Sequence, residues 1–252
     1  MNKISKKNKQ EIYDAWHREI YQLNLERDIE NFSFLHNKIL NYLHITDKDR
    51  GKLLDVACGK GLFLRAIRDV NKNIELFGTD ISSYAIDKAK KIVNGKFSVD
   101  DAEKLSYKSN LFDYITCLGG VEYFERPIKG IQEMVRVLKK DGTVIIFVPN
   151  LMFLGYVWLA FRYGTMPTHG GTSDEGQKIY DYNSEKFYTY RGWIDIIRSG
   201  GLEVIHTDRY DYLGRTRYAT PALIKLYNSI FYKLIPFNLT YSFVFTCKKQ
   251  SL

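Results

Sequence analysis

The chain of 252 residues is 45% hydrophobic and 26% charged, a balance that excludes a disordered or fibrous protein and predicts one large folded domain. Its three cysteines, Cys58, Cys117 and Cys247, stand far apart, which excludes a disulfide framework, offers no metal-ligand spacing and favours the reducing cytoplasm. The net charge of +8 permits acidic partners, but no nucleic-acid-binding motif accompanies it. We therefore expect a cytoplasmic protein with no metal ion and no nucleic-acid partner.

Strands and helices alternate as far as residue 148. Residues 9–46 carry apolar side chains at helical spacing, which predicts helical structure ahead of the first strand. Strands are predicted at 52–57, 74–79, 97–99, 114–118 and 143–148, and helices at 60–70, 83–93 and 127–138. Ser82-Ser83 supplies an N-cap for the helix at 83–93, and Asp141-Gly142 predicts a turn before the last strand. The alternation predicts right-handed βαβ units and a parallel sheet.

An apolar run crosses the end of this sheet. Residues 143–161 are almost entirely apolar and about long enough to span a bilayer. Pro149 interrupts the run, however, and the strand is needed to complete the sheet, so we expect a buried strand followed by a separate helix. Residues 164–176 are rich in Gly, Thr and Ser and are long for a connection, which predicts a functional loop.

The C-terminal part carries fewer signals. A helix is predicted at 193–198, and strands at 202–206 and 241–247 are expected as an antiparallel pair at one sheet edge. Residues 221–237 mix apolar and aromatic side chains with two lysines. This segment is interpreted either as a cap on the core or as an amphipathic helix on a membrane surface, and both readings stay open.

The most informative motif follows the first strand, where residues 55–61 read Asp-Val-Ala-Cys-Gly-Lys-Gly. Glycines one residue apart allow a sharp turn or the close approach of a ligand, and the helix that follows offers unpaired N–H groups and a positive dipole end. A dinucleotide fingerprint needs a third glycine, but Leu64 stands there, and Asp55 would repel a pyrophosphate. A nicotinamide-dependent oxidoreductase is therefore disfavoured.

A second acid completes the pattern. Asp80 follows the second strand, 19 positions after Gly61, where a carboxylate can accept both hydrogens of a ribose diol. Asp80 is placed for a ribose, the third glycine of a phosphate-binding turn is missing, and Asp55 stands at the turn. Together these features indicate a nucleoside cofactor that has a cationic end and no phosphates. Cys58 is expected to pack, and Lys60 and Arg65 are expected to be solvated.

These features resemble the class I S-adenosylmethionine-dependent methyltransferases of the small-molecule type. The similarity rests on five segments in order, at 55–61, 77–82, 100–103, 112–117 and 135–142. It implies an α/β, Rossmann-like, doubly wound sheet of seven strands, six parallel and the last antiparallel. It also implies a helical lid at 1–46 and a methyltransferase domain at 47–252. Within that domain we expect an acceptor loop at 150–190 and an embellishment at 207–240.

The resemblance also implies which residues hold S-adenosylmethionine. The glycine turn would surround its amino-acid end, the acid after the second strand its ribose, and the third segment its adenine, with Asp100 as an alternative to Asp101. The end of the fourth strand would form the wall near the sulfonium, and the first helix a lid, although its aromatic residues could equally be core. The implied residues are Tyr13, Trp16, Asp55, Ala57, Gly59, Gly61, Asp80, Ile81, Asp101, Ala102, Leu118, Gly119 and Tyr123.

The acceptor side is less defined. Candidate acid–base residues are His169 in the glycine-rich loop, Tyr123, which stands where relatives commonly have histidine, and His206. Three further tyrosines could shape an aromatic pocket: Tyr180, Tyr182 and Tyr188. We predict methyl transfer to a small-molecule or lipid-linked acceptor, first as O-methylation of a saccharide or secondary metabolite. Methylation of a quinone-like ring and non-catalytic cofactor binding are the alternatives, and the oligomeric state stays open.

Overall fold

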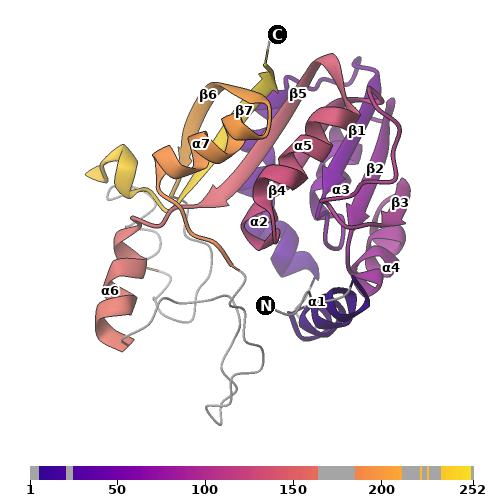
Figure 1. Cartoon of the computed structure of the whole chain (residues 1–252). Helices are drawn as coiled ribbons and strands as arrows, with labels where there is room; N and C mark the ends of the chain where they lie inside the picture. The colour runs from indigo at the N-terminus through magenta and orange to yellow at the C-terminus, as the bar shows by residue number, and fades with distance from the viewer. Residues whose placement is uncertain are drawn as a thin grey trace.

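The computed structural model describes residues 6–20, 25–163, 185–211, 222, 226 and 234–250. Its centre is a seven-stranded sheet in the order β3-β2-β1-β4-β5-β7-β6 (Figure 1). The strands are β1 (Gly51–Val56), β2 (Ile74–Asp80), β3 (Lys96–Val99), β4 (Phe112–Leu118), β5 (Leu138–Pro149), β6 (Leu202–Tyr210) and β7 (Ser242–Lys249). Strands β1 to β5 pair in parallel, and β7 runs antiparallel to both of its neighbours, β5 and β6. The predicted topology is confirmed.

Helices connect and flank the strands. The stretch predicted as helical before the first strand is two helices, α1 and α2, and the short η1 and η3 are 3-10 helices. The bounds are α1 (Lys6–Ile20), α2 (Leu25–Leu43), α3 (Leu62–Val70), α4 (Ser83–Ile92), η1 (Val121–Tyr123), α5 (Pro127–Val137), α6 (Leu154–Tyr163), α7 (Tyr190–Ser199) and η3 (Phe237–Leu239). The hydroxyl of Ser82 accepts a hydrogen bond from the amide of Ala85, so the predicted cap of α4 is present.

The sheet is buried on both faces, as a parallel sheet requires. Neighbouring residues of a strand point to opposite sides, and Leu53 and Leu54 accordingly belong to different core clusters. Helices α5 and α7 cover one face, with Trp193 fully buried against it. Helices α2, α3 and α4 cover the other face. Neither helix layer covers the carboxyl ends of the parallel strands, which point down in Figure 1, toward α1.

Strand β5 corrects one prediction. Phe112 pairs with Leu138 and Tyr114 with Thr143, so residues 139–142 stand opposite Asp113 alone in a wide irregularity. The expected turn at Asp141-Gly142 is therefore part of the strand. A Cβ on Gly142 would lie 2.6 Å from Cδ1 of Leu138, which explains why the bulge needs a glycine.

The apolar run at 143–161 divides as predicted, into β5, a break after Pro149 and the helix α6. Among the residues that the structure describes, no helix is both long enough and apolar enough to cross a bilayer.

Candidate functional site

The glycine turn lies at the carboxyl end of β1, between β2 and β4, where the direction of strand order reverses. Open α/β sheets bind their ligands at this switch point. The backbone there is held in the left-handed region, with φ of 58° at Ala57, 51° at Gly59 and 76° at Gly61. The last of these is the N-cap of α3, so the turn delivers the chain directly into that helix. Clustered positive φ values of this kind mark functional turns.

Strand β4 ends beside the same turn. Gly119 also has a positive φ, 74°, and a Cβ on Gly120 would lie 2.7 Å from Cβ of Ala57 and 2.9 Å from Sγ of Cys117. Only glycine allows the two strand ends to approach so closely. The two turns therefore form one backbone cradle.

Asp80 ties this cradle to β2. Its carboxylate is buried and accepts the amide of Gly59 at 2.9 Å through Oδ2 and the amide of Ser82 at 2.9 Å through Oδ1. A carboxylate has about four acceptor positions, so two remain for further donors such as a pair of hydroxyls. The structure thus gives Asp80 a second task that the sequence did not suggest, which is to fix the glycine turn.

Asp55 lies beneath the turn, 3% exposed. The hydroxyl of Thr116 on β4 donates to its Oδ1 at 2.6 Å. Burial raises the pKa of Asp55 to about 7, Thr116 opposes the rise and the charge of Asp80 adds to it. Asp55 therefore changes charge near neutral pH, and a cationic group placed on the turn would favour its ionised form.

In the third segment, the two adjacent acids, Asp100 and Asp101, have different hydrogen-bond and ion-pair partners. Oδ2 of Asp100 accepts the hydroxyls of Ser98 at 3.1 Å and Ser106 at 2.7 Å, which binds it into its own loop. Asp101 instead faces α1, where Nζ of Lys9 lies 4.0 Å from its Oδ2. The Oδ1 of Asp101 accepts the amide of Glu103 at 2.9 Å, so both acids also bond within their own loop. Ile81 and Ala102 are half-buried beside these acids.

Helix α1 packs over this edge of the sheet (Figure 1). The Tyr13 hydroxyl donates to the carbonyl of Tyr123 at 3.4 Å, and the ring of Trp16 lies 6.1 Å from the Tyr123 ring. Asp14, which sequence reasoning missed, accepts the hydroxyls of Ser82 at 2.5 Å and Ser83 at 3.0 Å. It also accepts the amide of residue 84 at 3.0 Å, at the N-terminus of α4.

Two further residues of this region were not predicted as parts of the site. His17 is buried with Nε2 3.8 Å from Oδ1 of Asp80. Burial lowers the pKa of His17 and outweighs the attraction of Asp80 and Asp14, while the charge of Lys60 lowers it further. Lys60 itself is 8% exposed, so its expected solvation is wrong; Arg65 is exposed and pairs with Asp69.

The wall beyond Gly119 is acidic and aromatic. Oε1 of Glu122, a buried residue, lies 3.7 Å from the Cβ position of Gly119. Burial raises the pKa of Tyr123 well above its usual value, and the charges of Glu185 and Glu122 raise it further. The Tyr123 hydroxyl is therefore a hydrogen-bond donor at neutral pH and not a base. Leu118 is half-buried at the end of β4.

The other acceptor candidates fall elsewhere. His169, Tyr180 and Tyr182 lie outside the described residues. His206 is exposed and contributes, with Tyr42, to a cavity of about 400 Å³. That cavity includes residues at the start of β5, at the opposite end of the sheet from the glycine turn, so His206 is not a site residue. Tyr188 packs its ring 4.9 Å from that of Trp193.

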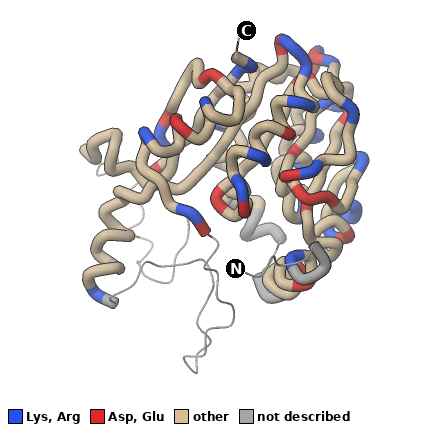
Figure 2. The backbone as a smooth tube through the Cα atoms, in the orientation of Figure 1, with Lys and Arg blue, Asp and Glu red and all other residues tan. Residues whose placement is uncertain are grey.

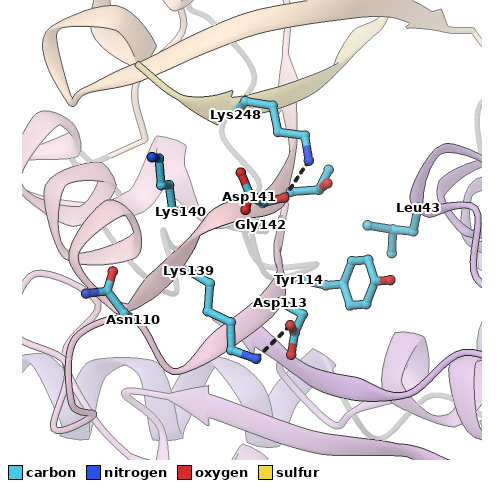
Figure 3. Close-up of a pocket in the computed structure, with 10 residues that line it drawn as sticks. Leu43, Asn110, Asp113, Tyr114, Lys139, Lys140, Asp141, Gly142 and Lys248 are labelled. Carbon is cyan, nitrogen blue, oxygen red and sulfur yellow. Dashed lines mark hydrogen bonds and ion pairs between the residues drawn. The ribbon is translucent and has the colours of Figure 1, made fainter. Parts of the chain in front are cut away.

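A larger cavity, about 670 Å³, opens beside it at the amino ends of β4 and β5 (Figure 3). Figure 3 shows Nζ of Lys139 directed at Asp113, 2.7 Å from Oδ1, and Nζ of Lys248 directed at the carbonyl of Asp141, also at 2.7 Å. Two of the lysines along this cavity, Lys139 and Lys248, thus bind groups of the protein itself. The cavity is separate from the cradle.

Comparison with known proteins decides the family. Residues 54–146 match the methyltransferase domain family. A demethylmenaquinone methyltransferase of Thermotoga maritima is 30% identical over 161 residues, which cover 61% of this chain and 70% of the relative. The chain belongs to the class I S-adenosylmethionine-dependent methyltransferases. The ubiquinone/menaquinone biosynthesis C-methyltransferase UbiE of Rickettsia prowazekii is 27% identical over 171 residues, 61% of this chain and 69% of that methyltransferase.

The fold of this methyltransferase is also that of solved relatives. An S-adenosylmethionine-dependent methyltransferase of Thermotoga maritima aligns with a TM-score of 0.65, over 96% of this chain and 99% of that one, at 16% identity. The predicted fold is thereby confirmed, and the family match together with the methyltransferase relatives confirms the predicted enzyme class and cofactor. The site suits that cofactor: the glycine cradle has room for a close backbone approach, and two carboxylates face it without any phosphate-binding glycine triplet.

Proposed function

We propose that this methyltransferase methylates a ring carbon of a quinol-type acceptor, with the predicted cofactor residues in the roles given above. The curated relatives described above are named for demethylmenaquinone and ubiquinone/menaquinone biosynthesis, which supports the second of our expectations over O-methylation of a saccharide. The observation that carries the proposal is the wall beside Gly119, where the buried carboxylate of Glu122 lies against Gly119 and Tyr123 follows with its amide bonded to the carbonyl of Gly120 at 3.0 Å. A hydroxylated ring is the acceptor that such a wall fits.

In this proposal Glu122 removes the proton from a ring hydroxyl, which raises electron density on the neighbouring ring carbon. Tyr123, held protonated by burial and donating its hydroxyl to Glu185, packs its ring against that of the acceptor. S-adenosylmethionine, when bound, would supply a methyl group on a cationic sulfur, and the sulfur would leave with the electron pair of the broken bond. The methylated ring carbon would pass its own proton to water so that aromaticity returns, and protonated Glu122 would give its proton back to the ring oxygen. Positioning supplies most of the acceleration, because the cationic sulfur is already a good leaving group.

We further propose that α1 is the lid of this site. Its residues touch both the acceptor wall, through Tyr13 and Trp16, and the start of α4, through Asp14. A lid held at both places would exclude water from the transferring methyl group. It would also place His17 against Asp80, the proposed ribose acid.

Glu122→Gln tests the acceptor chemistry. The amide keeps the shape of the side chain but cannot take a proton, so kcat toward a demethylated quinol should fall by about 100-fold or more. The affinity for S-adenosylmethionine, measured by calorimetry, should change little. Glu75→Gln is the matched control, because Glu75 pairs with Lys96 on the surface at 3.0 Å, at the start of β2 and away from α1. Equal activity of the two variants would remove Glu122 from the mechanism.

A further inference from the structure

Helix α6 turns an apolar stripe outward. Leu154, Val157, Trp158 and Phe161 are 53%, 49%, 61% and 92% exposed. Their spacing places them on one face of the helix. A contiguous patch of large apolar side chains is uncommon on a free surface and marks a place of contact.

The orientation of α6 is fixed by its other face. Tyr156 is 7% exposed, and its ring centre lies 5.2 Å from that of Phe153, 5.3 Å from that of Phe187 and 5.9 Å from that of Tyr241. This aromatic anchor holds the helix against Tyr241, at the start of β7. The outward stripe is therefore a consequence of how the helix packs.

A second segment continues the same surface. Nδ2 of the buried Asn150 donates to the carbonyls of Asn238 at 2.9 Å and Thr240 at 2.8 Å, which fastens the segment around η3 next to the start of α6. In that segment Leu234 is 72% exposed and Phe237 37% exposed. Figure 1 shows α6 and η3 together on the left of the molecule, away from α3 and α4. We call the exposed side chains of the two segments the apolar face: Leu154, Val157, Trp158, Phe161, Leu234 and Phe237.

The elements that carry the apolar face are basic where they are charged. Arg162 is the single charged residue of α6, and Figure 2 shows no acidic residue along that helix. In the sequence, residues 212–240, which lead into and include η3, contain Arg215, Arg217, Lys225 and Lys233 and no acidic residue, whereas Asp174, Glu175 and Asp181 stand between α6 and α7, outside the described part of the chain. Apolar and aromatic side chains flanked by basic ones are the composition that binds an anionic lipid interface. A second copy of the chain would instead bring like charges together.

We propose that the apolar face docks this methyltransferase on an anionic membrane surface, so that a lipid-soluble acceptor reaches the site from the bilayer. The proposal rests on the proposed function, because only an acceptor with an apolar tail requires it. Helix α6 follows β5 directly, and β5 ends at the same sheet edge as the glycine cradle. The inner side of α6 adjoins Glu122: the ring of Tyr156 packs 5.3 Å from that of Phe187, and the amide of the preceding Lys186 donates to the carbonyl of Glu122 at 2.9 Å.

Vesicle sedimentation tests the docking. The full chain should bind vesicles that contain phosphatidylglycerol, bind neutral phosphatidylcholine vesicles more weakly, and lose binding as salt is added. The double variant Trp158→Ser and Phe161→Ser should lower partitioning onto the vesicles at least tenfold, because it removes two large exposed side chains that the bilayer would bury. Trp158→Phe should keep it. The control pair Val70→Ser and Ile205→Ser removes side chains that are 45% and 54% exposed on α3 and β6, and should bind like wild type.

Two results would overturn the proposal. One is an absence of vesicle binding, or binding that the double variant does not weaken. The other is a stable dimer in analytical ultracentrifugation that the same double variant dissociates, which would assign the face to a second copy. Methyl transfer to a detergent-dispersed quinol separates the two proposals: the double variant should retain it. A wild-type chain that binds vesicles but methylates no quinol would refute the acceptor assignment and leave the docking surface intact.

Discussion

Replacing Asp55 with Asn isolates the cost of the buried charge beneath the glycine turn. Asp55 is 3% exposed, and Thr116 donates to it at 2.6 Å. The amide oxygen of Asn can accept the same hydrogen bond, so the substitution changes charge more than shape. We expect the variant to be more stable than the wild type near neutral pH and to bind S-adenosylmethionine more weakly, since the cation loses its counter-charge.

The magnitude follows from the pKa of Asp55, which rises from 3.8 to about 7 on folding. Between pH 3.8 and about 7 the folded protein keeps a proton on Asp55 that the unfolded chain has lost, so the free energy of unfolding falls as the pH rises. At about 1.4 kcal/mol per pKa unit, the full loss is of the order of 4 kcal/mol and is complete above about pH 7. Asn does not titrate. Between about pH 5 and 7 the variant should therefore gain about 2 kcal/mol on the wild type.

Urea unfolding, followed by tryptophan fluorescence at several pH values, measures this difference. Subtracting the wild-type free energy of unfolding from that of the variant at each pH cancels the contribution of the other titrating groups. Thr116→Val is the companion variant: it removes the donor that lowers the pKa of Asp55, so the loss of stability should extend to higher pH. A stability difference between Asp55→Asn and wild type that is constant from about pH 5 to 7 would refute the buried-charge reasoning.

Three other predictions concern the lid, the core and the cradle. Asp14→Ala should cost about 1 kcal/mol of stability and speed hydrogen exchange in α1, because three donors at the start of α4 lose their acceptor; unchanged protection of α1 would contradict the lid. Burial lowers the pKa of His36 from 6.5 to about 4, so the unfolded chain alone binds this proton as pH falls from about 6.5 to 4. Stability should fall by about 3 kcal/mol over that window, and the pH dependence of the urea midpoint in His36→Gln should lack this fall. Gly120→Ala should lower the melting temperature by the equivalent of about 1–3 kcal/mol, since its Cβ would meet Ala57 at 2.7 Å; a melting curve like that of the wild type would show that the strand ends can separate freely.

Local sequence patterns predicted most of the fold and the glycine cradle. The acid–glycine spacing at Asp55, Gly59 and Gly61 lies within one strand–turn–helix unit, so its meaning could be read from neighbouring residues alone. The same holds for the Ser82 cap and for the division of the apolar run at Pro149. The turn expected at Asp141-Gly142 is instead a bulge of β5, because Leu138 and Thr143 on either side of it both pair with β4.

Long-range contacts could not be predicted in this way. Asp14 meets the start of α4 across 69 residues of sequence, and no local pattern marks it as a helix cap. Lys60 looks like a solvated helix residue until α1 brings His17 within range of its charge. Glu122 was visible only as part of a Glu-Tyr pair, and its role as a candidate base depends on the approach of its carboxylate to Gly119.

The central claim is methyl transfer from S-adenosylmethionine to a quinol ring at the Gly59–Gly119 cradle. Its most direct test supplies the purified chain with S-adenosylmethionine carrying a labelled methyl group and a reduced, demethylated lipid quinol in detergent. Mass spectrometry of the organic extract should show the label on a ring carbon, in equal amount to the S-adenosylhomocysteine formed, and Asp80→Ala should abolish both products. Tight cofactor binding without transfer to the quinol, or transfer that Asp80→Ala leaves intact, would contradict the account.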